Sequence, residues 1–221
     1  MSTRLILVRH GQSVDNVAGK LSGWLDSDLT PHGERQALHA AQHVVERFRP
    51  TALYASPLIR TAKTAQHVAR RAALTIAYRD DLRELFFGHF EGLTLAEIRE
   101  RFPVEWARSQ DEDDMDFGWP GGEERRAFYG RILGAFDELI VRHPNENVVV
   151  VSHGGVLSSY LAQLVDGRPS RWRSYLLENC AYAIVEANGS EISVVQWNVI
   201  EHLPNPESGD ALWQKLQGDP K

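Results

Sequence analysis

Two histidines in this chain, each followed by a glycine, stand directly after short aliphatic runs. The triplet RHG (residues 9–11) follows LILV at 5–8, and SHGG (152–155) follows four valines at 148–151. A neutral imidazole can attack as a nucleophile and form a covalent intermediate, and a guanidinium beside it can hold an anion. Glycine after the histidine would let the backbone pass close to that anion. The pattern is suited to a site that handles a phosphoryl group.

Two other places offer the remaining groups that phosphoryl transfer needs. Arg60 lies in SPLIRTAKTA (56–65), on the first turn of a predicted helix, where it could share the charge of the phosphoryl oxygens with Arg9. The leaving oxygen needs a proton, and LRELFFGHFEGLT (82–94) offers Glu84 and Glu91. The residues alone leave the choice between these two carboxyl groups open.

Each of these side chains also has a simpler interpretation, as a surface charge or a helix cap. Two other kinds of site stay open as well. A non-catalytic module that binds phosphate is one, although such a module would be expected to have lost His10 or Glu84. A histidine metal site is the other, but no aspartate pair or HxH spacing accompanies His10 and His153. We therefore expect no metal.

Alternating strands and helices would bring the candidate residues together. The sequence predicts strands at 5–8, 51–56, 74–78 and 145–153, and helices at 31–48, 57–71, 123–142 and from near 155. Two more strands, at 181–186 and 191–197, are joined by the hairpin signal Asn188-Gly189. This order indicates an α/β fold with a mostly parallel sheet and an antiparallel edge. Ligands bind beyond the carboxyl ends of such strands, where the two histidines and two arginines would meet.

Composition narrows the class of protein. The chain has 221 residues, 43% hydrophobic and 24% charged, which suits one substantial α/β domain and argues against disorder. A net charge of −6 argues against a nucleic-acid binder, and the lone Cys180 allows no intrachain disulfide. The sequence has no apolar stretch long enough for a bilayer and no room for a signal peptide before the first strand. We expect a cytoplasmic monomer or homodimer whose partner is a small phosphorylated substrate, with no nucleic acid and no membrane.

Five stretches resemble, in order and spacing, the motifs of the histidine phosphatase superfamily, which includes the cofactor-dependent phosphoglycerate mutases. They are RHGQSVDN, SGWLDSDLTPHG, SPLIRTAKTA, LRELFFGHFEG and VSHGG, and the likeness runs from about residue 5 to about 186. The resemblance implies a doubly wound sheet with helices on both faces and a small helical cap. It also implies phosphoryl transfer through a phosphohistidine, without a metal or other cofactor.

The resemblance assigns roles to particular residues. His10 matches the nucleophile, and Glu84 matches the acid/base glutamate. The phosphate-pocket residues correspond to Arg9, Arg60 and His153. Substrate-binding positions that line or flank the pocket correspond to Asn16, Gly23 and Asn179. The pair Gly122-Glu123 fits as well, but Glu124 follows it where the family has a serine, which puts contacts between cap and substrate in doubt.

The resemblance leaves two reactions open, hydrolysis and mutase chemistry. The expected enzyme is a histidine acid-type phosphatase, a phosphoric monoester hydrolase, because the segment between Glu84 and His153 is short and the chain lacks the mutase sequence after its glutamate. A mutase would also need a second basic cluster for a carboxylate, for which Arg125 and Arg126 are the candidates.

The sequence predicts one domain at 1–202, with a cap segment at about 93–122, and a tail at 203–221. The cap holds an acidic run, 111–116, which would repel polyanions if it lay at the pocket entrance. It also holds aromatic residues that would form either a wall for the substrate or the cap's own core. These aromatic residues are Phe102, Trp106, Phe117 and Trp119.

Overall fold

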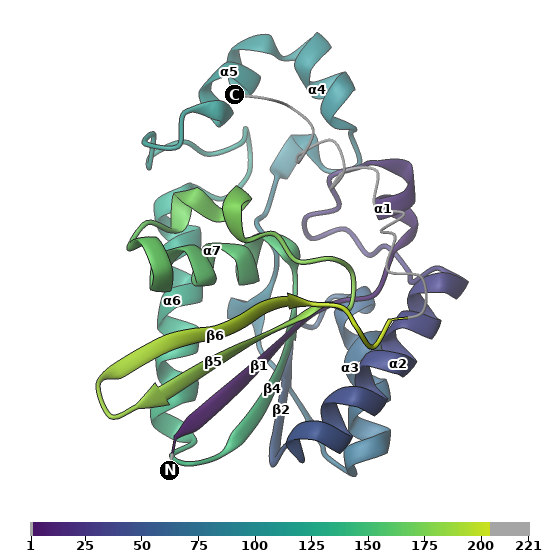
Figure 1. The fold of residues 1–221 in the computed structure, drawn as a ribbon. Coiled ribbons are helices and arrows are strands. Elements are labelled where there is room, and N and C mark those ends of the chain that lie inside the picture. The colour runs from purple at the N-terminus through teal and green to yellow at the C-terminus, as the bar shows by residue number, and fades with distance from the viewer. Residues whose placement is uncertain (1, 204–221) are drawn as a thin grey trace.

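A six-stranded sheet forms the centre of the computed structural model, which describes residues 2–203 (Figure 1). The strands are β1 (Thr3–Arg9), β2 (Ala52–Ala55), β3 (Ile76–Tyr78), β4 (Asn147–Ser152), β5 (Tyr182–Asn188) and β6 (Glu191–Val199). Their order is β3-β2-β4-β1-β5-β6. Strands β1 to β4 are parallel, and β5 and β6 form an antiparallel hairpin beside β1. The predicted mostly parallel sheet with an antiparallel edge is confirmed.

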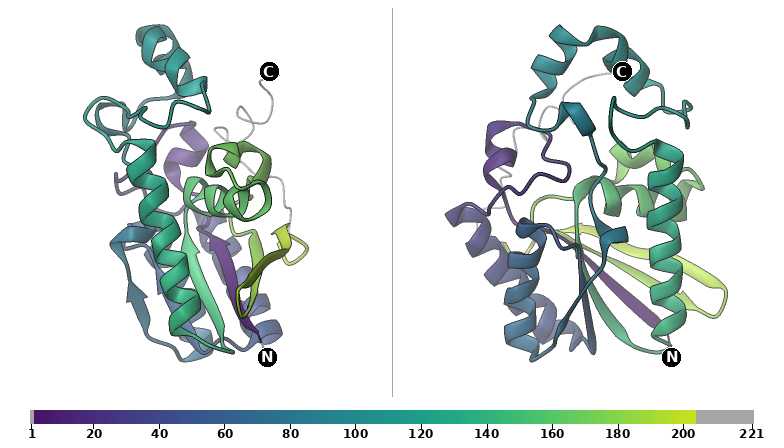
Figure 2. Two further views of the ribbon diagram at one scale, coloured as in Figure 1. Left: turned by 90° about the vertical axis from the view of Figure 1, so that its left-hand side faces the viewer. Right: turned by 180° about the vertical axis from the view of Figure 1, so that it is seen from behind.

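Helices cover both faces of the sheet, because its central strands are apolar on both sides (Figure 2). Leu5 and Leu7 of β1 pack with residues of α6 (Arg125–Arg142) and α7 (Gly154–Asp166). Ile6 and Val8 point to the opposite face and pack with α2 (Pro31–Phe48) and α3 (Ile59–Ala72). The sheet is therefore doubly wound, as the resemblance implied.

The helix boundaries agree with the predictions except at two starts. Helix α2 begins as predicted, with the Thr30 hydroxyl accepting a hydrogen bond from the Gly33 N–H. Helix α3 begins at Ile59 rather than at residue 57, because the backbone of Leu58 is extended (φ −62°, ψ 141°) and cannot belong to a helix. Helix α6 begins at Arg125 rather than at residue 123, because the backbone of Glu124 is extended as well (φ −74°, ψ 145°).

Several short elements had no predicted bounds, although a small helical cap was expected. They are α1 (Val14–Ala18), α4 (Leu95–Arg101), α5 (Pro103–Gln110) and the 3-10 helices η1 (Asp80–Leu82), η2 (Gly88–Phe90) and η3 (Pro169–Tyr175). Helices α4 and α5 lie above the carboxyl ends of the strands, within the segment that we predicted as a cap (Figures 1 and 2). All but the first residue of the predicted tail lies outside the described residues, and the domain limits stay a prediction. No helix within 2–203 is both long and apolar enough to cross a membrane.

Candidate active site

The two predicted histidines lie side by side because β1 and β4 are neighbours in parallel register. Arg9 is paired with Ser152, so the next residues, His10 and His153, leave the sheet together. The His10 N–H donates to the Ser152 carbonyl (3.0 Å), and the two imidazole centroids are 5.3 Å apart. Helix α7 begins directly after His153. The site therefore lies at the carboxyl edge of the sheet, as predicted.

A hydrogen bond fixes the proton on the His10 ring. Nδ1 lies 2.8 Å from the carbonyl oxygen of Gly11, which can only accept, so Nδ1 carries the proton and Nε2 keeps its lone pair. The pKa of His10 is well below its ordinary value because the ring is buried and because Arg60 and Arg9 are nearby cations. The imidazole is therefore neutral at neutral pH, with Nε2 as its nucleophilic atom.

Two buried guanidinium groups flank this imidazole. Arg60 donates to the carbonyls of Leu25 (2.9 Å) and Gly23 (2.7 Å). Burial lowers the pKa of Arg60 to about 10, and the Glu84 carboxylate opposes that shift, so Arg60 is a cation at neutral pH. Arg9 donates from Nη1 to the Leu177 carbonyl (2.8 Å). Both arginines and His10 line one pocket, which is the arrangement expected for an oxyanion site.

Of the two glutamates, it is Glu84 that lines this pocket. Its Oε2 accepts from the Gly155 N–H at the start of α7 (3.0 Å), and Oε1 accepts from its neighbour's N–H, that of Leu85 (2.9 Å). A side chain at position 155 would collide with the Glu84 carboxylate, so that contact requires the glycine. Glu84 is thus in place to act as a proton donor.

Glu91 has a different place. Its Oε1 accepts from the backbone N–H groups of Trp24 (2.7 Å) and Phe87 (3.3 Å), and it does not line the pocket. Burial raises the pKa of Glu91. Gly23, with φ of +50°, has no room for a side chain beside this carboxylate. Glu91 therefore holds the loop at 23–24, whose Gly23 carbonyl orients Arg60.

The loop that carries Glu84 is fixed by two residues that the sequence analysis missed. Arg131 of α6 donates to the carbonyls of Asp81 (2.9 Å), Arg83 (2.8 Å) and Glu84 (3.3 Å). The Trp24 indole N–H donates to the Glu84 carbonyl as well (2.8 Å). Nothing in the local sequence marks Arg131, because its acceptors lie about fifty residues earlier in the chain.

The other predicted residues lie around His10 rather than all in the pocket. Asn16 and Gly23 line it, whereas His153 and Asn179 are buried behind it. The Asn179 amide donates to the His10 carbonyl (3.1 Å) and to Asn16 Oδ1 (3.2 Å). His153 contacts the Ser56 hydroxyl through Nε2 (2.8 Å) and leaves Nδ1 without a hydrogen-bond partner among residues 2–203. Burial lowers the pKa of His153 well below its ordinary value, so this ring is neutral too.

The glycine after His10 has a reason that we did not predict. A Cβ at Gly11 would collide with the carbonyl oxygen of Gly33 at the start of α2. The missing side chain thus allows close packing of two backbone segments. We expected Gly11 to let the backbone pass close to the anion, but the contact with Gly33 explains the glycine by packing between two backbone segments instead.

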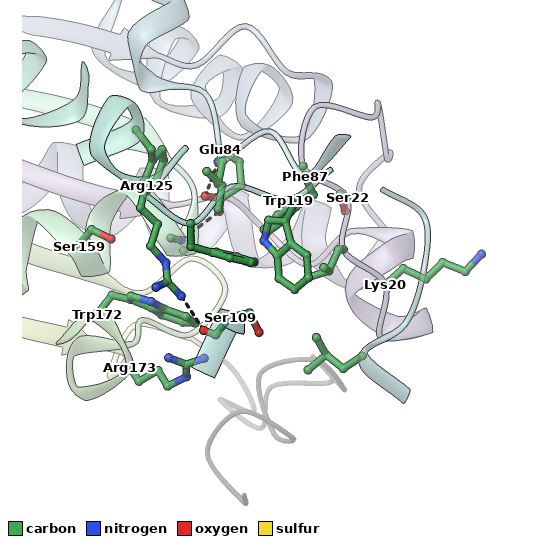
Figure 3. Close-up of a pocket in the computed structure, with 18 of the residues that line it drawn as sticks. Lys20, Ser22, Glu84, Phe87, Ser109, Trp119, Arg125, Ser159, Trp172 and Arg173 are labelled. Atoms are coloured by element: carbon green, nitrogen blue, oxygen red, sulfur yellow. Dashed lines mark hydrogen bonds between the residues drawn. The ribbon is translucent and has the colours of Figure 1, made fainter. Parts of the chain in front are cut away.

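The pocket extends from His10 beneath the cap and has a volume of about 160 Å³. This is an order of magnitude more than the roughly 10–15 Å³ that a single water needs, so there is room for a leaving group beside the phosphoryl group. Trp106, Phe117 and Trp119 line the pocket and also pack in the cap's apolar cluster, whereas Phe102 belongs to the cluster alone. Figure 3 shows Trp119 among the lining residues. Three of the four aromatic residues therefore belong to the cap's core and also face the pocket, whereas a contact with the substrate stays a prediction.

The acidic run is paired with arginines. The pairs are Glu112 with Arg173, Asp113 with Arg168, Asp114 with Arg108 and Asp116 with Arg126. Two of these arginines, Arg168 and Arg173, stand after α7, outside the cap segment. The run therefore links the cap loop to the rest of the protein instead of presenting unbalanced negative charge.

Within the described part of the chain, no three His, Cys, Asp or Glu side chains are grouped so that they could hold a metal ion. The site is instead a neutral imidazole between two arginines, with a carboxyl group beside it. These are the components of an enzyme that moves a phosphoryl group through a histidine.

Comparison with known proteins agrees with this class. The family model of the histidine phosphatase superfamily (branch 1) matches residues 5–200, and the chain belongs to this superfamily. The chain is 32% identical over 200 residues to phosphoserine phosphatase 1 of Hydrogenobacter thermophilus, covering 90% of this chain and 94% of that protein. It is 29% identical over 221 residues to the metal-independent phosphoserine phosphatase of Arabidopsis thaliana, covering 99% and 90%.

Solved structures share the fold over nearly the whole length. The phosphoserine phosphatase of Entamoeba histolytica in complex with 3-phosphoglyceric acid superposes with a TM-score of 0.81 at 27% identity, covering 91% of this chain and 100% of that one. The mycobacterial glucosyl-3-phosphoglycerate phosphatase gives a TM-score of 0.78 at 28% identity, covering 90% and 100%. The chain is a phosphatase of this superfamily, whose members work through a phosphohistidine intermediate.

Proposed function

We propose that His10 is the residue that carries the phosphoryl group, and that Glu84 is the acid and base of the hydrolysis. The observation that supports this most directly is the tautomer of His10. Its Nδ1 proton is held by the Gly11 carbonyl, and its neutral ring stands between Arg9 and Arg60. Nε2 is therefore the atom with which His10 attacks phosphorus.

The reaction then has two balanced steps. In the first, Nε2 forms a bond to phosphorus as the bond from phosphorus to the ester oxygen breaks, and that oxygen takes a proton from Glu84. In the second, water gives a proton to the Glu84 carboxylate and attacks phosphorus, and the N–P bond breaks. Inorganic phosphate leaves, and both side chains return to their starting states.

The remaining pocket residues bind the phosphoryl oxygens in this proposal. Arg9 and Arg60 supply positive charge that is already oriented by the carbonyls of Leu177, Leu25 and Gly23. The unpaired Nδ1 of His153 would gain a partner if a phosphoryl oxygen reached it. Asn16 and Gly23 line the same space, and Asn179 acts on the His10 backbone.

We propose a small phosphomonoester as the substrate, held at its other end by the aromatic residues of the cap. Relatives named as phosphoserine phosphatases and as a glucosyl-3-phosphoglycerate phosphatase make phosphoserine and phosphorylated sugar acids the first compounds to test. The finer class, a histidine acid-type phosphatase, is supported by the lowered pKa of His10, which keeps the nucleophile neutral in mild acid. A cytoplasmic monomer or homodimer without nucleic-acid or membrane partners also belongs to this proposal.

Rapid quenching with a labelled phosphomonoester tests the assignment. We expect an acid-labile, base-stable phosphoenzyme in the wild type and none in His10→Ala, with turnover lost. An adduct that persists in His10→Ala and disappears in His153→Ala would exchange the roles of the two histidines. The same preparation is assayed on 3-phosphoglycerate with and without bisphosphoglycerate, because efficient isomerisation without phosphate release would identify a mutase instead.

A further inference from the structure

The pocket has a second basic end, away from His10. Arg125 lines it from α6 and Arg173 lines it from η3, next to Trp172 (Figure 3). Arg126, the other candidate for a second basic cluster, is an exposed residue paired with Asp116. Lys20 is on the opposite side of the pocket, and its ammonium group points away from Arg173 in Figure 3. The second cluster is therefore Arg125 with Arg173, of which the sequence analysis found only the first.

Arg125 is committed to the cap backbone. Its guanidinium donates to the carbonyls of Asp111, Asp114 (3.0 Å) and Ser109 (2.6 Å). The side chain stacks on Phe117, with the guanidinium carbon 4.9 Å from the ring centroid. Arg125 thus folds the cap loop and adds a positive charge to this end of the pocket.

Arg173 has its hydrogen-bond donors available. It donates no hydrogen bond to any residue in the described range 2–203, and its side chain is 26% exposed. Its guanidinium carbon lies 4.5 Å from the Trp172 ring centroid, which holds the group in place. The facing carboxylate is Glu112, at 3.8 Å from N to O, which is too long for a hydrogen bond. A cation so held, with unused donors in a substrate pocket, is a binding group for an anion.

The charges at this end select the kind of anion. Arg125 and Arg173 contribute two positive charges and Glu112 one negative charge. Tyr129, which lines the same end, stays neutral because burial raises its pKa. The balance is a single positive charge, which matches a carboxylate better than the nearly doubly charged phosphate.

We propose that Arg173 binds a carboxylate on the leaving group of the substrate, so that this chain prefers phosphomonoesters of hydroxy acids. This inference rests on the proposed function, because it requires the phosphoryl group to be at His10. The carbon chain of the ester then lies along the aromatic residues between the two basic ends. The Glu112 carboxylate is the group that the substrate carboxylate replaces beside Arg173.

Two esters with the same carbon skeleton test the preference. 3-Phosphoglycerate has a carboxylate at the position where glycerol 3-phosphate has a hydroxymethyl group, and the two compounds are otherwise the same. We expect the wild type to have the higher kcat/KM for 3-phosphoglycerate. In Arg173→Met the ratio of the two kcat/KM values falls about 10- to 100-fold, the range for losing a charge-assisted hydrogen bond. Arg126→Met is the matched control, because Arg126 is an exposed arginine next to Arg125 that does not line the pocket, and it keeps the wild-type ratio.

A second variant and a third ester cover the other outcomes. Glu112→Gln removes the competing carboxylate and raises the ratio a few-fold, which tests the idea even if Arg173→Met does not fold. Propane-1,3-diol bisphosphate tests whether a second phosphate is the true ligand, and a higher kcat/KM for it than for 3-phosphoglycerate overturns the carboxylate assignment. Hydrolysis with an unchanged ratio in Arg173→Met overturns it as well and leaves the proposed function intact. If the wild type hydrolyses p-nitrophenyl phosphate but none of the three esters, this inference fails and the proposed function stands. If it hydrolyses none of these four compounds and no phosphoserine, both fail.

Discussion

The protonation state of one ring governs what the site can do. Histidine is a common nucleophile in enzymes, but the reactivity of His10 depends on a neutral ring with the lone pair on Nε2. The Gly11 carbonyl fixes the tautomer, and burial with two neighbouring arginines keeps the ring neutral. In the proposed reaction the arginines also bind the phosphoryl oxygens, so the same two charges would serve the nucleophile and the substrate.

The pH behaviour of His10 follows from this arrangement. Its pKa in the folded protein is below the ordinary value of 6.5, so the neutral ring persists as the pH falls through 6.5 and is lost only in stronger acid. We expect the His10 ring resonances in an NMR titration without phosphate to stay constant from pH 8 to pH 6. Arg60→Met removes one nearby cation and should move the His10 titration to higher pH. A midpoint at or above 6.5 in the wild type would contradict the neutral nucleophile.

At the scale of elements, α6 fixes the loop that carries Glu84, the proposed acid. Arg131 binds three carbonyls at 81–84, and a bidentate ion pair with Glu123 (2.9 and 2.6 Å) holds its guanidinium in turn. Helix α7 supplies the other restraint through the Gly155 N–H. Two successive helices, both distant in the sequence from Glu84, thus determine where its carboxyl group stands, and Arg131 is a positioning residue.

Arg131→Met should therefore act through Glu84. We expect it to slow hydrolysis of an alkyl phosphate about 10-fold while changing p-nitrophenyl phosphate little, because p-nitrophenolate leaves without a proton. Glu84→Gln should show the same pattern more strongly, with a loss of about 10²–10⁴-fold on the alkyl ester. Arg131→Lys should recover part of the loss, and Arg142→Met, an exposed arginine at the end of α6, should have no effect. Equal losses on both esters in Arg131→Met would indicate a general structural defect instead.

At the scale of the whole molecule, buried histidines couple the fold to pH. His10 and His153 lie at the carboxyl edge of the sheet, and His202 packs on His43 near the described end of the chain. Burial lowers the pKa of His202 to about 4, and burial lowers that of His43 as well. All four rings therefore bind a proton less readily in the folded protein than in the unfolded chain, and protons are taken up when the chain unfolds in mild acid.

The free energy of unfolding should fall as the pH drops from 6.5 toward 5. In that range the unfolded chain binds protons that the folded protein does not, and each such histidine contributes up to about 1.4 kcal/mol per pH unit. His202→Gln removes one of these groups and should flatten the slope. Urea unfolding of the wild type and the variant at pH 7, 6 and 5 in phosphate-free buffer measures the two slopes. A free energy of unfolding that stays constant or rises as the pH drops over this range would contradict the prediction.

Local signals in the sequence determined the framework of the site. The aliphatic runs at 5–8 and 148–151 define two buried strands, and the histidines that follow them had to reach the same edge once those strands paired in parallel. Thr30 with Pro31 fixed the start of α2, and Asn188 with Gly189 fixed the hairpin. Such features depend on residues within a few positions along the chain, so they can be predicted from the sequence alone.

The tertiary structure decided everything that depends on contacts between distant segments. It separated Glu84 from Glu91, since only the former meets the start of α7, and it placed Asn179 behind His10 instead of in the pocket. It placed Gly11 so close to the backbone of Gly33 that no side chain fits there. It also brought Arg173 rather than Arg126 to the pocket. A long charged side chain carries no local sign of its partner, because its guanidinium can reach carbonyls or carboxylates on any element that the fold packs beside it.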